Sequence, residues 1–233
     1  MVNRNVATLQ HLAGTKPLKK YEESFTAPDQ TLNGYNNWIT NVWLTQNDGN
    51  GGYYAPHQIS GNTMWTGVYC NQNTQGYVAA SYNSKFLINN FSVLKGSMQI
   101  RKYVVGTADR IYGGFSFGGE STEVMGVRFY AYMGGSSALI ALNGTGSAQS
   151  SDIAMPNSTW YNFEIEITKT YAKAWLYPVG SPRPPAPTFK CASNIIDFNY
   201  LVNKHCGVYS RIHCNNENKT LWTYMKNLKI TIQ

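Results

Sequence analysis

The segment from residue 160 to residue 177 alternates between apolar and polar side chains in two runs, separated by Lys169 and Thr170. Alternation with a period of two is typical of β-strands with one buried face. A two-residue turn between the runs predicts an antiparallel hairpin. One face then carries three apolar pairs: Phe163–Leu176, Ile165–Ala174 and Ile167–Ala172. The other face carries two pairs that contain charged residues: Glu166–Lys173 and Glu164–Trp175. A slip of one residue would mix the faces, so the pattern specifies the register.

Short runs of the same kind continue from Tyr21 to the C-terminus, separated by turn clusters rich in glycine and asparagine. The candidate strands are residues 21–26, 38–44, 64–70, 76–82, 97–105, 111–118, 125–132, 137–142, 160–168, 171–177, 207–213 and 222–232. Charged residues make up only 13% of the chain and aromatic residues 14%, which is typical of strands joined by tight turns rather than of disorder. The sequence therefore predicts an all-β fold, an antiparallel β-sandwich or jelly roll. The proline-rich stretch 178–187 predicts a stiff exposed loop or an edge crossing.

The first 20 residues differ from the rest of the chain. They contain Arg4, Lys16, Lys19 and Lys20 and no acidic residue, so they hold more than half of the net charge of +7. We expect residues 1–20 to form a basic N-terminal arm, either extended or with a short helix over 5–13, and residues 21–233 to form the sandwich. The arm is a candidate for docking onto a partner through these four cations, and a solvated tail is the alternative.

Beyond residue 20 the chain is nearly neutral, with 15 basic and 12 acidic residues. Nucleic-acid-binding proteins gain most of their affinity by neutralising phosphates, so no nucleic-acid partner is expected. No run approaches the ~18 apolar residues of a membrane span, and the N-terminus lacks the apolar core of a secretory signal. We therefore expect no membrane partner and a protein made in the cytoplasm that leaves it by a route such as virion release.

Four segments carry a family resemblance, in order along the chain: residues 21–26 with Leu32-Asn33-Gly34 and Trp38, residues 113–117 with 127–130, residues 160–182, and residues 207–210 with 225–230. Together they resemble the concanavalin A-like lectin/glucanase superfamily, in the laminin G-like form found in phage and bacterial surface proteins. The resemblance covers residues 21–233 and implies the jelly-roll fold. It leaves function open, because the same sandwich serves in lectins, glycanases, lyases and structural modules.

Glycan hydrolysis needs two carboxylates on either side of the scissile bond. The related glucanases carry Glu-x-Asp-x-x-Glu on one strand, whereas this chain has Glu164-Ile165-Glu166 without a third carboxylate. Glu166 faces Lys173 across the predicted hairpin, which favours an ordinary solvent face. No Gly-x-Ser-x-Gly motif is present. The sequence therefore predicts that the chain is not an enzyme.

Two His-Cys pairs, His205-Cys206 and His213-Cys214, raise the question of a zinc site. On one strand the two cysteines would lie about 27 Å apart, so one metal ion does not reach both. The Asp48-Gly49-Asn50 turn lacks a second acidic residue for calcium. We expect no metal and no cofactor, and free thiols at the four cysteines Cys70, Cys191, Cys206 and Cys214.

Three aromatic residues are candidates for stacking on sugar rings, because they lie among asparagine and glutamine residues: Tyr53, Tyr54 and Trp65. A core position is the alternative for each of them.

The leading hypothesis is a non-enzymatic virion structural protein, a phage capsid decoration or tail-surface component. Its partners would be capsid or tail proteins and further copies of itself, and surface glycans are a candidate ligand. A glycan-binding lectin module of a secreted or cell-surface protein, which would be extracellular, is the alternative. A glycanase or polysaccharide lyase is third.

Overall fold

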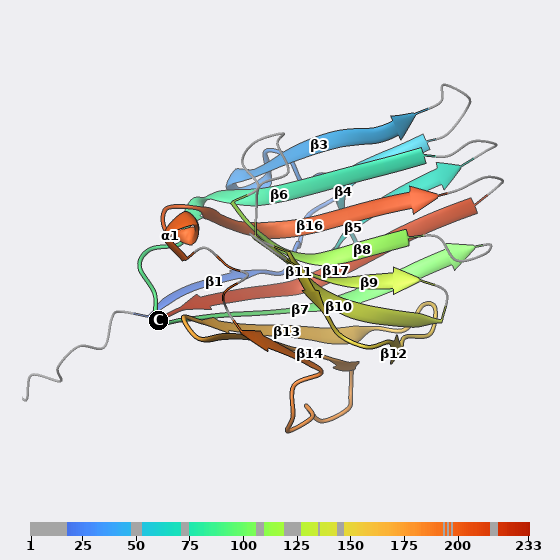
Figure 1. The fold of residues 1–233 in the computed structure, drawn as a ribbon. Helices are drawn as coiled ribbons and strands as arrows, with labels where there is room; N and C mark the ends of the chain where they lie inside the picture. The colour runs from blue at the N-terminus through green and yellow to red at the C-terminus, as the bar shows by residue number, and fades with distance from the viewer. Residues whose placement is uncertain are drawn as a thin grey trace, which may run out of the picture.

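The computed structural model describes residues 18–47, 53–70, 75–105, 110–118, 127–134, 136–143, 147–192, 194, 196, 198–214 and 219–233. Two antiparallel sheets, here named sheet A and sheet B, stack face to face, and sheet B lies toward the viewer in Figure 1. The prediction of an antiparallel β-sandwich is confirmed. No helix in the described residues is long and apolar enough to cross a membrane.

Sheet A has nine strands in the spatial order β15-β14-β13-β7-β17-β5-β4-β2, with β1 paired to β17. Their bounds are β1 Lys19–Glu23, β2 Gln30–Thr31, β4 Tyr53–Ser60, β5 Thr63–Cys70, β7 Val93–Val105, β13 Tyr161–Thr168, β14 Tyr171–Pro178, β15 Phe189–Ala192 and β17 Lys219–Ile232.

Sheet B has eight strands in the order β11-β10-β9-β8-β16-β6-β3, with β12 paired to β10. Their bounds are β3 Trp38–Asn47, β6 Gln75–Leu87, β8 Arg110–Phe117, β9 Val127–Gly134, β10 Ser137–Asn143, β11 Ser147–Gln149, β12 Ile153–Ala154 and β16 His205–Cys214. One 3₁₀ turn, η1 (Tyr35–Asn37), and one short helix, α1 (Phe198–Leu201), are also described.

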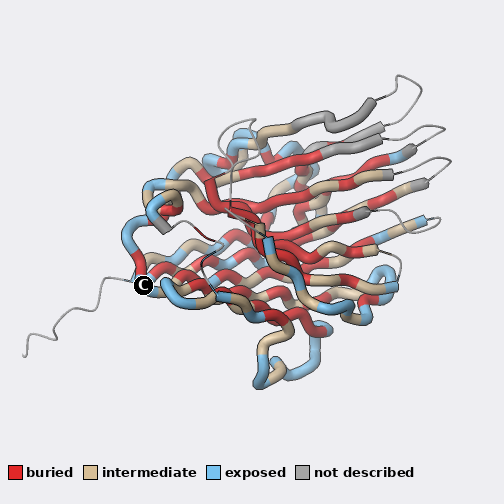
Figure 2. Tube along the Cα trace, viewed as in Figure 1, coloured by how far each residue is buried: buried red, intermediate tan, exposed pale blue. Residues whose placement is uncertain are grey.

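The β13–β14 hairpin has the predicted register: Phe163 pairs with Leu176, Ile165 with Ala174 and Ile167 with Ala172. All six side chains are buried. Together with the inner faces of the other strands they form the core between the sheets, which appears as red tube in both layers of Figure 2. The alternation in the sequence therefore specified both the hairpin and its buried face. The proline-rich stretch forms the loop that leads from β14 to the edge strand β15.

Every candidate strand coincides with an observed strand, but β4 was missed. Pro56 and His57 interrupt its apolar pattern, and its pairing with β5 shifts between Ala55 and Gln58. Proline has no N–H for the ladder and is tolerated at such an irregularity. The short strands β2, β11, β12 and β15 were also missed, since runs of two to four residues show little periodicity.

The first strand begins two residues before the expected domain boundary. Lys19 and Lys20, assigned above to the arm, pair with Ile232 and Thr231 of β17. Lys19 donates a hydrogen bond to the carbonyl of Leu87 over 2.8 Å, and Lys20 forms an ion pair with Glu22. These two lysines therefore belong to the sandwich. Arg4, Lys16 and the helix expected over 5–13 lie outside the described residues.

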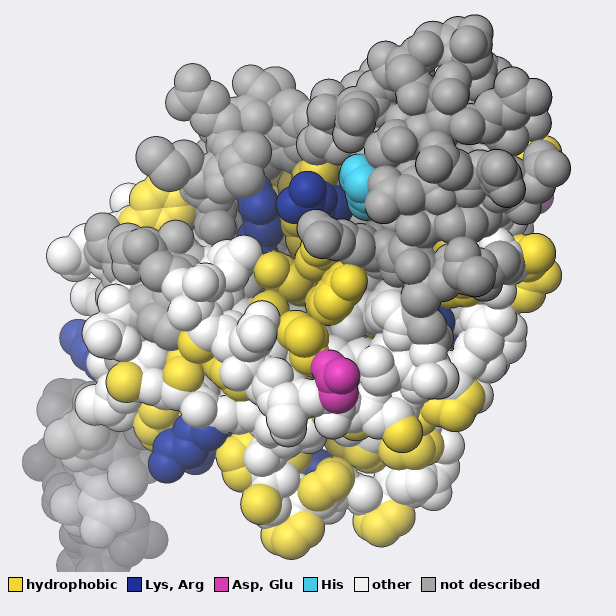
Figure 3. All heavy atoms as spheres, turned by 45° about the vertical axis from the view of Figure 1, so that its right-hand side comes forward, with side chains coloured by type: hydrophobic (Ala, Val, Ile, Leu, Met, Phe, Trp, Pro, Cys, Tyr) yellow, Lys and Arg dark blue, Asp and Glu magenta, His cyan; other side chains and the backbone are white. Residues whose placement is uncertain are grey.

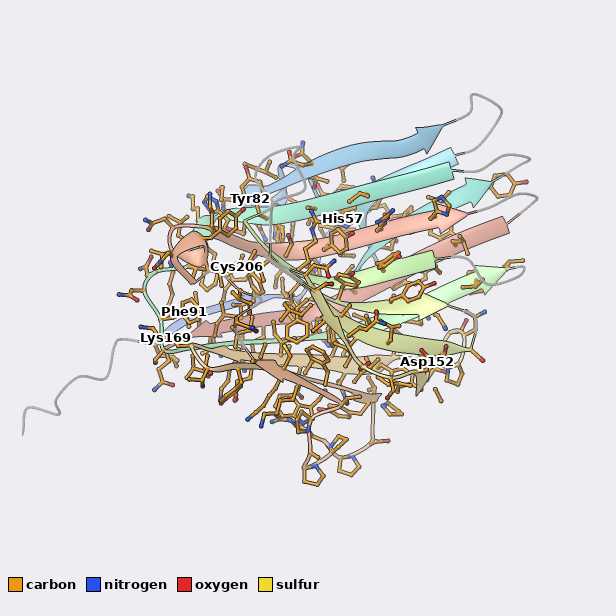
Figure 4. All side chains as sticks on the ribbon, in the orientation of Figure 1. His57, Tyr82, Phe91, Asp152, Lys169 and Cys206 are labelled. Atoms are coloured by element: carbon orange, nitrogen blue, oxygen red, sulfur yellow. The ribbon has the colours of Figure 1, made fainter. Side chains whose placement is uncertain are left out.

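A buried polar chain joins the two sheets. The ring of His57, on β4, is hydrogen bonded through Nδ1 to Ser81 of β6 and through Nε2 to Ser210 of β16. Ser81 is bonded in turn to Thr40 of β3. His57 is fully buried, and Figure 4 shows it reaching into the interior of the sandwich. Because buried polar groups need partners, this chain satisfies the ring while it links the sheets.

Candidate functional site: a tyrosine–arginine face on sheet B

The outer face of sheet B carries aromatic residues where a solvent-facing sheet usually carries small polar ones. In β9, Phe129 and Ala131 point into the core, and Arg128, Tyr130 and Tyr132 alternate with them. Because side chains alternate along a strand, these three face outward. Neighbouring strands add Tyr112 from β8, and Tyr209 and Arg211 from β16. We call these six residues the tyrosine–arginine face.

Strand pairing brings the six residues together. Tyr112 lies in register between Tyr132 and Arg211, and Gly114 lies between Tyr130 and Tyr209. The tyrosine rings touch, with centroids 5.3 Å apart for Tyr112 and Tyr130, 4.9 Å for Tyr112 and Tyr132, and 5.5 Å for Tyr130 and Tyr209. Figure 3 shows hydrophobic side chains, tyrosine included, gathered beside cationic side chains and a histidine on this side of the molecule.

The two arginines lie over these rings. The guanidinium carbon of Arg128 is 4.8 Å from the centre of the Tyr209 ring, and that of Arg211 is 5.5 Å from the Tyr112 ring. The Nε atoms of both arginines and the hydroxyl of Ser116, which pairs with Arg128 in the ladder, are buried without a hydrogen-bond partner. Within the described part of the chain, neither arginine forms an ion pair with a carboxylate.

The strands of sheet B contain no aspartate or glutamate in their sequences. A desolvated cation without a counter-ion is costly, so this face favours an anionic group from outside the sheet. The planar guanidinium binds carboxylate, sulfate or phosphate oxygens in pairs, and tyrosine supplies both an apolar ring and a polar hydroxyl. The arrangement can therefore hold a ligand that has flat apolar surfaces and negative charge.

The hydroxyls of Tyr130 and Tyr209 stay protonated across the physiological range. Burial, followed by the neighbouring Tyr209 and Tyr112, raises the pKa of Tyr130 to about 12. Burial also raises the pKa of Tyr209. Asn143 donates a hydrogen bond to the Tyr130 hydroxyl oxygen over 3.0 Å, which leaves that O–H available as a donor.

Sequence reasoning did not select this face. Its members come from three strands, β8, β9 and β16, which contribute one, three and two residues, and β16 is distant in the chain from the other two. The available signal was the repeated spacing of two between cationic and aromatic residues, as in Arg128-Phe129-Tyr130 and Tyr209-Ser210-Arg211.

Glu164 and Glu166 lie half-buried on the outer face of sheet A, and Glu166 faces Lys173 across the hairpin as predicted, 3.9 Å from its Nζ. Glu166 accepts a hydrogen bond from the Tyr171 hydroxyl over 2.7 Å and lies 3.4 Å from Lys95 Nζ. Glu164 accepts a hydrogen bond from Tyr177 and lies 3.3 Å from Arg183 Nε.

These partners decide the charge state of Glu166. Burial raises its pKa, but the Tyr171 hydroxyl and the nearby lysines more than offset that effect, so the pKa of Glu166 is below its ordinary value. A carboxylic acid that protonates a glycosidic oxygen needs a raised pKa, which is the opposite shift. A cavity of about 240 Å³ lies beside the pair.

Of the three residues predicted to stack on sugar rings, the structure describes the side chain of Trp65. Trp65, on β5, faces outward from sheet A, opposite Tyr224 of β17 in the ladder. It therefore lies on the other side of the sandwich from the tyrosine–arginine face. Tyr53 and Tyr54 are in β4, and their side chains lie outside the described part of the structure.

The histidines and cysteines are dispersed. His205 and Cys214 are the two ends of the single strand β16, and Cys206 is buried in the core (Figure 4). In the portions of the chain that the structure describes, no three histidine, cysteine or acidic side chains come together as metal ligands. Cys191 and Cys206 are free thiols, and the side chains of Cys70 and Cys214 are not described.

The chain matches no known family model and no curated protein sequence. Its fold is shared by many solved structures. The laminarinase catalytic domain from Thermotoga maritima superposes with a TM-score of 0.55 at 8% identity, over 91% of this chain and 97% of that one. The CBM2 module of the evolved Dit protein of Lactobacillus casei phage J-1 gives 0.52 at 8% identity, over 92% and 96%. A protein of unknown function from Shewanella oneidensis MR-1 gives 0.56 at 12% identity, over 92% and 86%.

These neighbours correct the prediction that the chain is not an enzyme. Several of them are glycoside hydrolases, including a β-1,3(4)-glucanase and an endo-β-galactosidase. The absence of the Glu-x-Asp-x-x-Glu motif therefore does not tell whether a chain with this fold binds a glycan or also cleaves it. The CBM2 module and the glucanases alike share the two-sheet arrangement described above, and the chain has the jelly-roll sandwich fold of the concanavalin A-like type.

Proposed function

We propose that this protein binds an anionic polysaccharide on the tyrosine–arginine face of sheet B. One observation carries the proposal: two guanidinium groups lie against tyrosine rings with unpartnered Nε atoms, on a sheet without acidic residues. Arg128, Tyr130 and Tyr209 are themselves buried, so the half-buried rings of Tyr112 and Tyr132 would stack on the apolar faces of sugars. The half-buried guanidinium group of Arg211 would pair with uronate or sulfate groups.

A polysaccharide fits this face better than a nucleic acid does. Nucleic-acid affinity depends on neutralising many phosphates along a basic track. The chain beyond residue 20 has only a small excess of positive charge, and the face holds just two arginines.

We place this binding activity on the surface of a virion, where the protein would contact capsid or tail proteins and further copies of itself. The phage Dit module with the same fold and the basic residues Arg4 and Lys16 support this setting. Deleting residues 1–17, which leaves β1 intact, should abolish co-sedimentation with particles and leave the melting temperature unchanged. Normal co-sedimentation of the truncated protein would refute docking through the arm.

Affinity electrophoresis in gels that contain polygalacturonate tests the binding activity. The wild type should be retarded by this uronate polymer and not by neutral dextran, and retardation should weaken with salt because charge contributes. Arg211→Gln and Tyr112→Ala should each weaken binding by about tenfold, the loss expected for a central anchor residue.

Lys190→Gln is the matched control, because it removes one positive charge from the exposed edge strand β15. Equal loss in the control and in Arg211→Gln would show only a general charge effect and contradict a site on sheet B. Analysis of the same polymer after incubation separates the two activities known for this fold, since release of oligosaccharides would assign hydrolysis to the bound state.

A further inference from the structure

A second aromatic surface lies on the opposite side of the sandwich, on the outer face of sheet A. Trp65 of β5 and Trp222 of β17 lie with ring centroids 4.7 Å apart, and Tyr224 continues the row at 6.4 Å from Trp222. We call these three rings, together with Arg101 of β7 and Trp160, the tryptophan surface. Of its members, the sequence predicts only Trp65 as a binding residue.

The sheet beneath is shaped to receive Trp222. A Cβ atom at Gly67, the residue opposite Trp222 in the ladder, would lie 2.5 Å from its indole ring. The indole therefore lies flat over the glycine, and any larger residue at position 67 would displace it.

Arg101 is held between two aromatic rings. Its guanidinium carbon lies 4.2 Å from the centre of the Tyr224 ring and 4.9 Å from the Trp160 ring. Its Nε atom is buried without a hydrogen-bond partner, and no carboxylate of the described residues pairs with it. Lys226 adds a second cation, with Nζ 4.3 Å from the centre of the Trp160 ring.

Arg101 and the rings of Trp65, Trp222 and Tyr224 border a shallow cavity of about 310 Å³. Its remaining wall consists of Ser60 and Thr63. That volume is at the small end of the range for ligand sites, so it suits a short segment of a longer chain. Aromatic rings, hydroxyl groups and an uncompensated cation are the groups that a charged sugar requires.

The positive charge of the tryptophan surface favours a negatively charged ligand. The sequences of β5, β7 and β17 contain no aspartate or glutamate. A second copy of this chain would bring another positively charged protein against Arg101 and Lys226, which is repulsive. An acidic polysaccharide supplies the opposite charge as well as the flat apolar faces that stack on tryptophan.

We infer that the tryptophan surface is a second binding site for an acidic polysaccharide, so that the protein binds sugar chains on both faces of the sandwich. This inference extends the proposed function but does not depend on which residues of sheet B bind. Two sites on opposite faces link separate polymer chains and raise the overall avidity.

Titration with polygalacturonate, followed by calorimetry and by turbidity, tests the inference. The wild type should bind with two sites per molecule and should cross-link the polymer into a turbid network. Trp222→Ala and Arg101→Gln should each remove one site, abolish the turbidity and leave binding by sheet B intact. Gly67→Val should act in the same way, because it displaces the indole without removing it.

Arg183→Gln is the matched control. Arg183 also stacks on a tryptophan of sheet A, 3.7 Å from the ring centre of Trp175, but it pairs with Glu164. Its replacement should leave the number of sites unchanged. Unfolding curves confirm that each variant is folded, and a variant that is unfolded is replaced by Trp65→Ala.

The outcomes separate the two sites. Loss of all binding in Arg211→Gln, with no effect of Trp222→Ala, overturns the tryptophan site and leaves the proposed function standing. Residual binding in Arg211→Gln that disappears when Trp222→Ala is added supports the tryptophan site. Equal retention of dextran by the tryptophan surface, or a dimer that depends on Trp222, overturns the inference.

Discussion

Acidification should destabilise this protein through His57, the buried ring that joins the two sheets. A neutral imidazole has one donor and one acceptor, which suits its two hydroxyl partners, Ser81 and Ser210. A protonated ring would be a buried charge without a counter-ion, which is costly. Burial accordingly lowers the pKa of His57 from 6.5 to about 3.

The sign and size of the effect follow from this difference. Below pH 6.5 the unfolded chain binds a proton at His57 while the folded protein does not, so protonation favours unfolding. The free energy of unfolding should fall as the pH drops from about 6.5 to about 3, by about 1.4 kcal/mol for each pH unit in that range. The full loss approaches about 5 kcal/mol, a large part of the stability of an ordinary domain.

Urea denaturation at pH 7.5, 6.5, 5.5 and 4.5 measures the effect, with His57→Gln compared with the wild type. The variant should lose this part of the pH dependence, so the difference in stability between the two proteins should shrink by about 2 kcal/mol between pH 6.5 and 4.5. Ser81→Ala is the control, since it removes a hydrogen-bond partner at every pH but retains the titrating ring. Identical pH dependence in wild type and His57→Gln would refute the reasoning.

Three further outcomes are expected. Ile165→Ala should cost about 2–5 kcal/mol in urea denaturation, and more than Glu166→Ala, which should cost about 1 kcal/mol; a larger effect at Glu166 would contradict the observed faces of the hairpin. In native thiol labelling Cys206 should react only on unfolding, because it is buried with a raised pKa, whereas the half-buried Cys191 should react in the folded protein; labelling of Cys206 before unfolding would contradict its placement in the core. Gly207→Ala should destabilise by about 1–3 kcal/mol or more, because the new methyl group would clash with a carbonyl oxygen of β6; an unchanged denaturation midpoint would contradict the close approach of β16 and β6.

The alternation of apolar and polar residues was sufficient to predict the buried and exposed faces of a single strand. The alternation from Phe163 to Leu176 specified the hairpin, its register and its buried side, because a slip of one residue exposes the whole apolar set. The same reasoning located the other long strands. It failed at β4, where Pro56 and the buried His57 interrupt the alternation at an irregular step of the ladder.

The candidate sites depended on pairing that local pattern does not specify. Arg128 and Arg211 lie over rings of one tyrosine cluster, Tyr209 and Tyr112, only because β9, β8 and β16 are adjacent in sheet B. The sequence by itself determined that Arg128 and Tyr130 share one face of a strand, since the side-chain period is two. Only the tertiary structure decided that Tyr209 and Arg211 lie beside them, because strand order is set by long-range packing of the two sheets around one core, which no short stretch of sequence encodes.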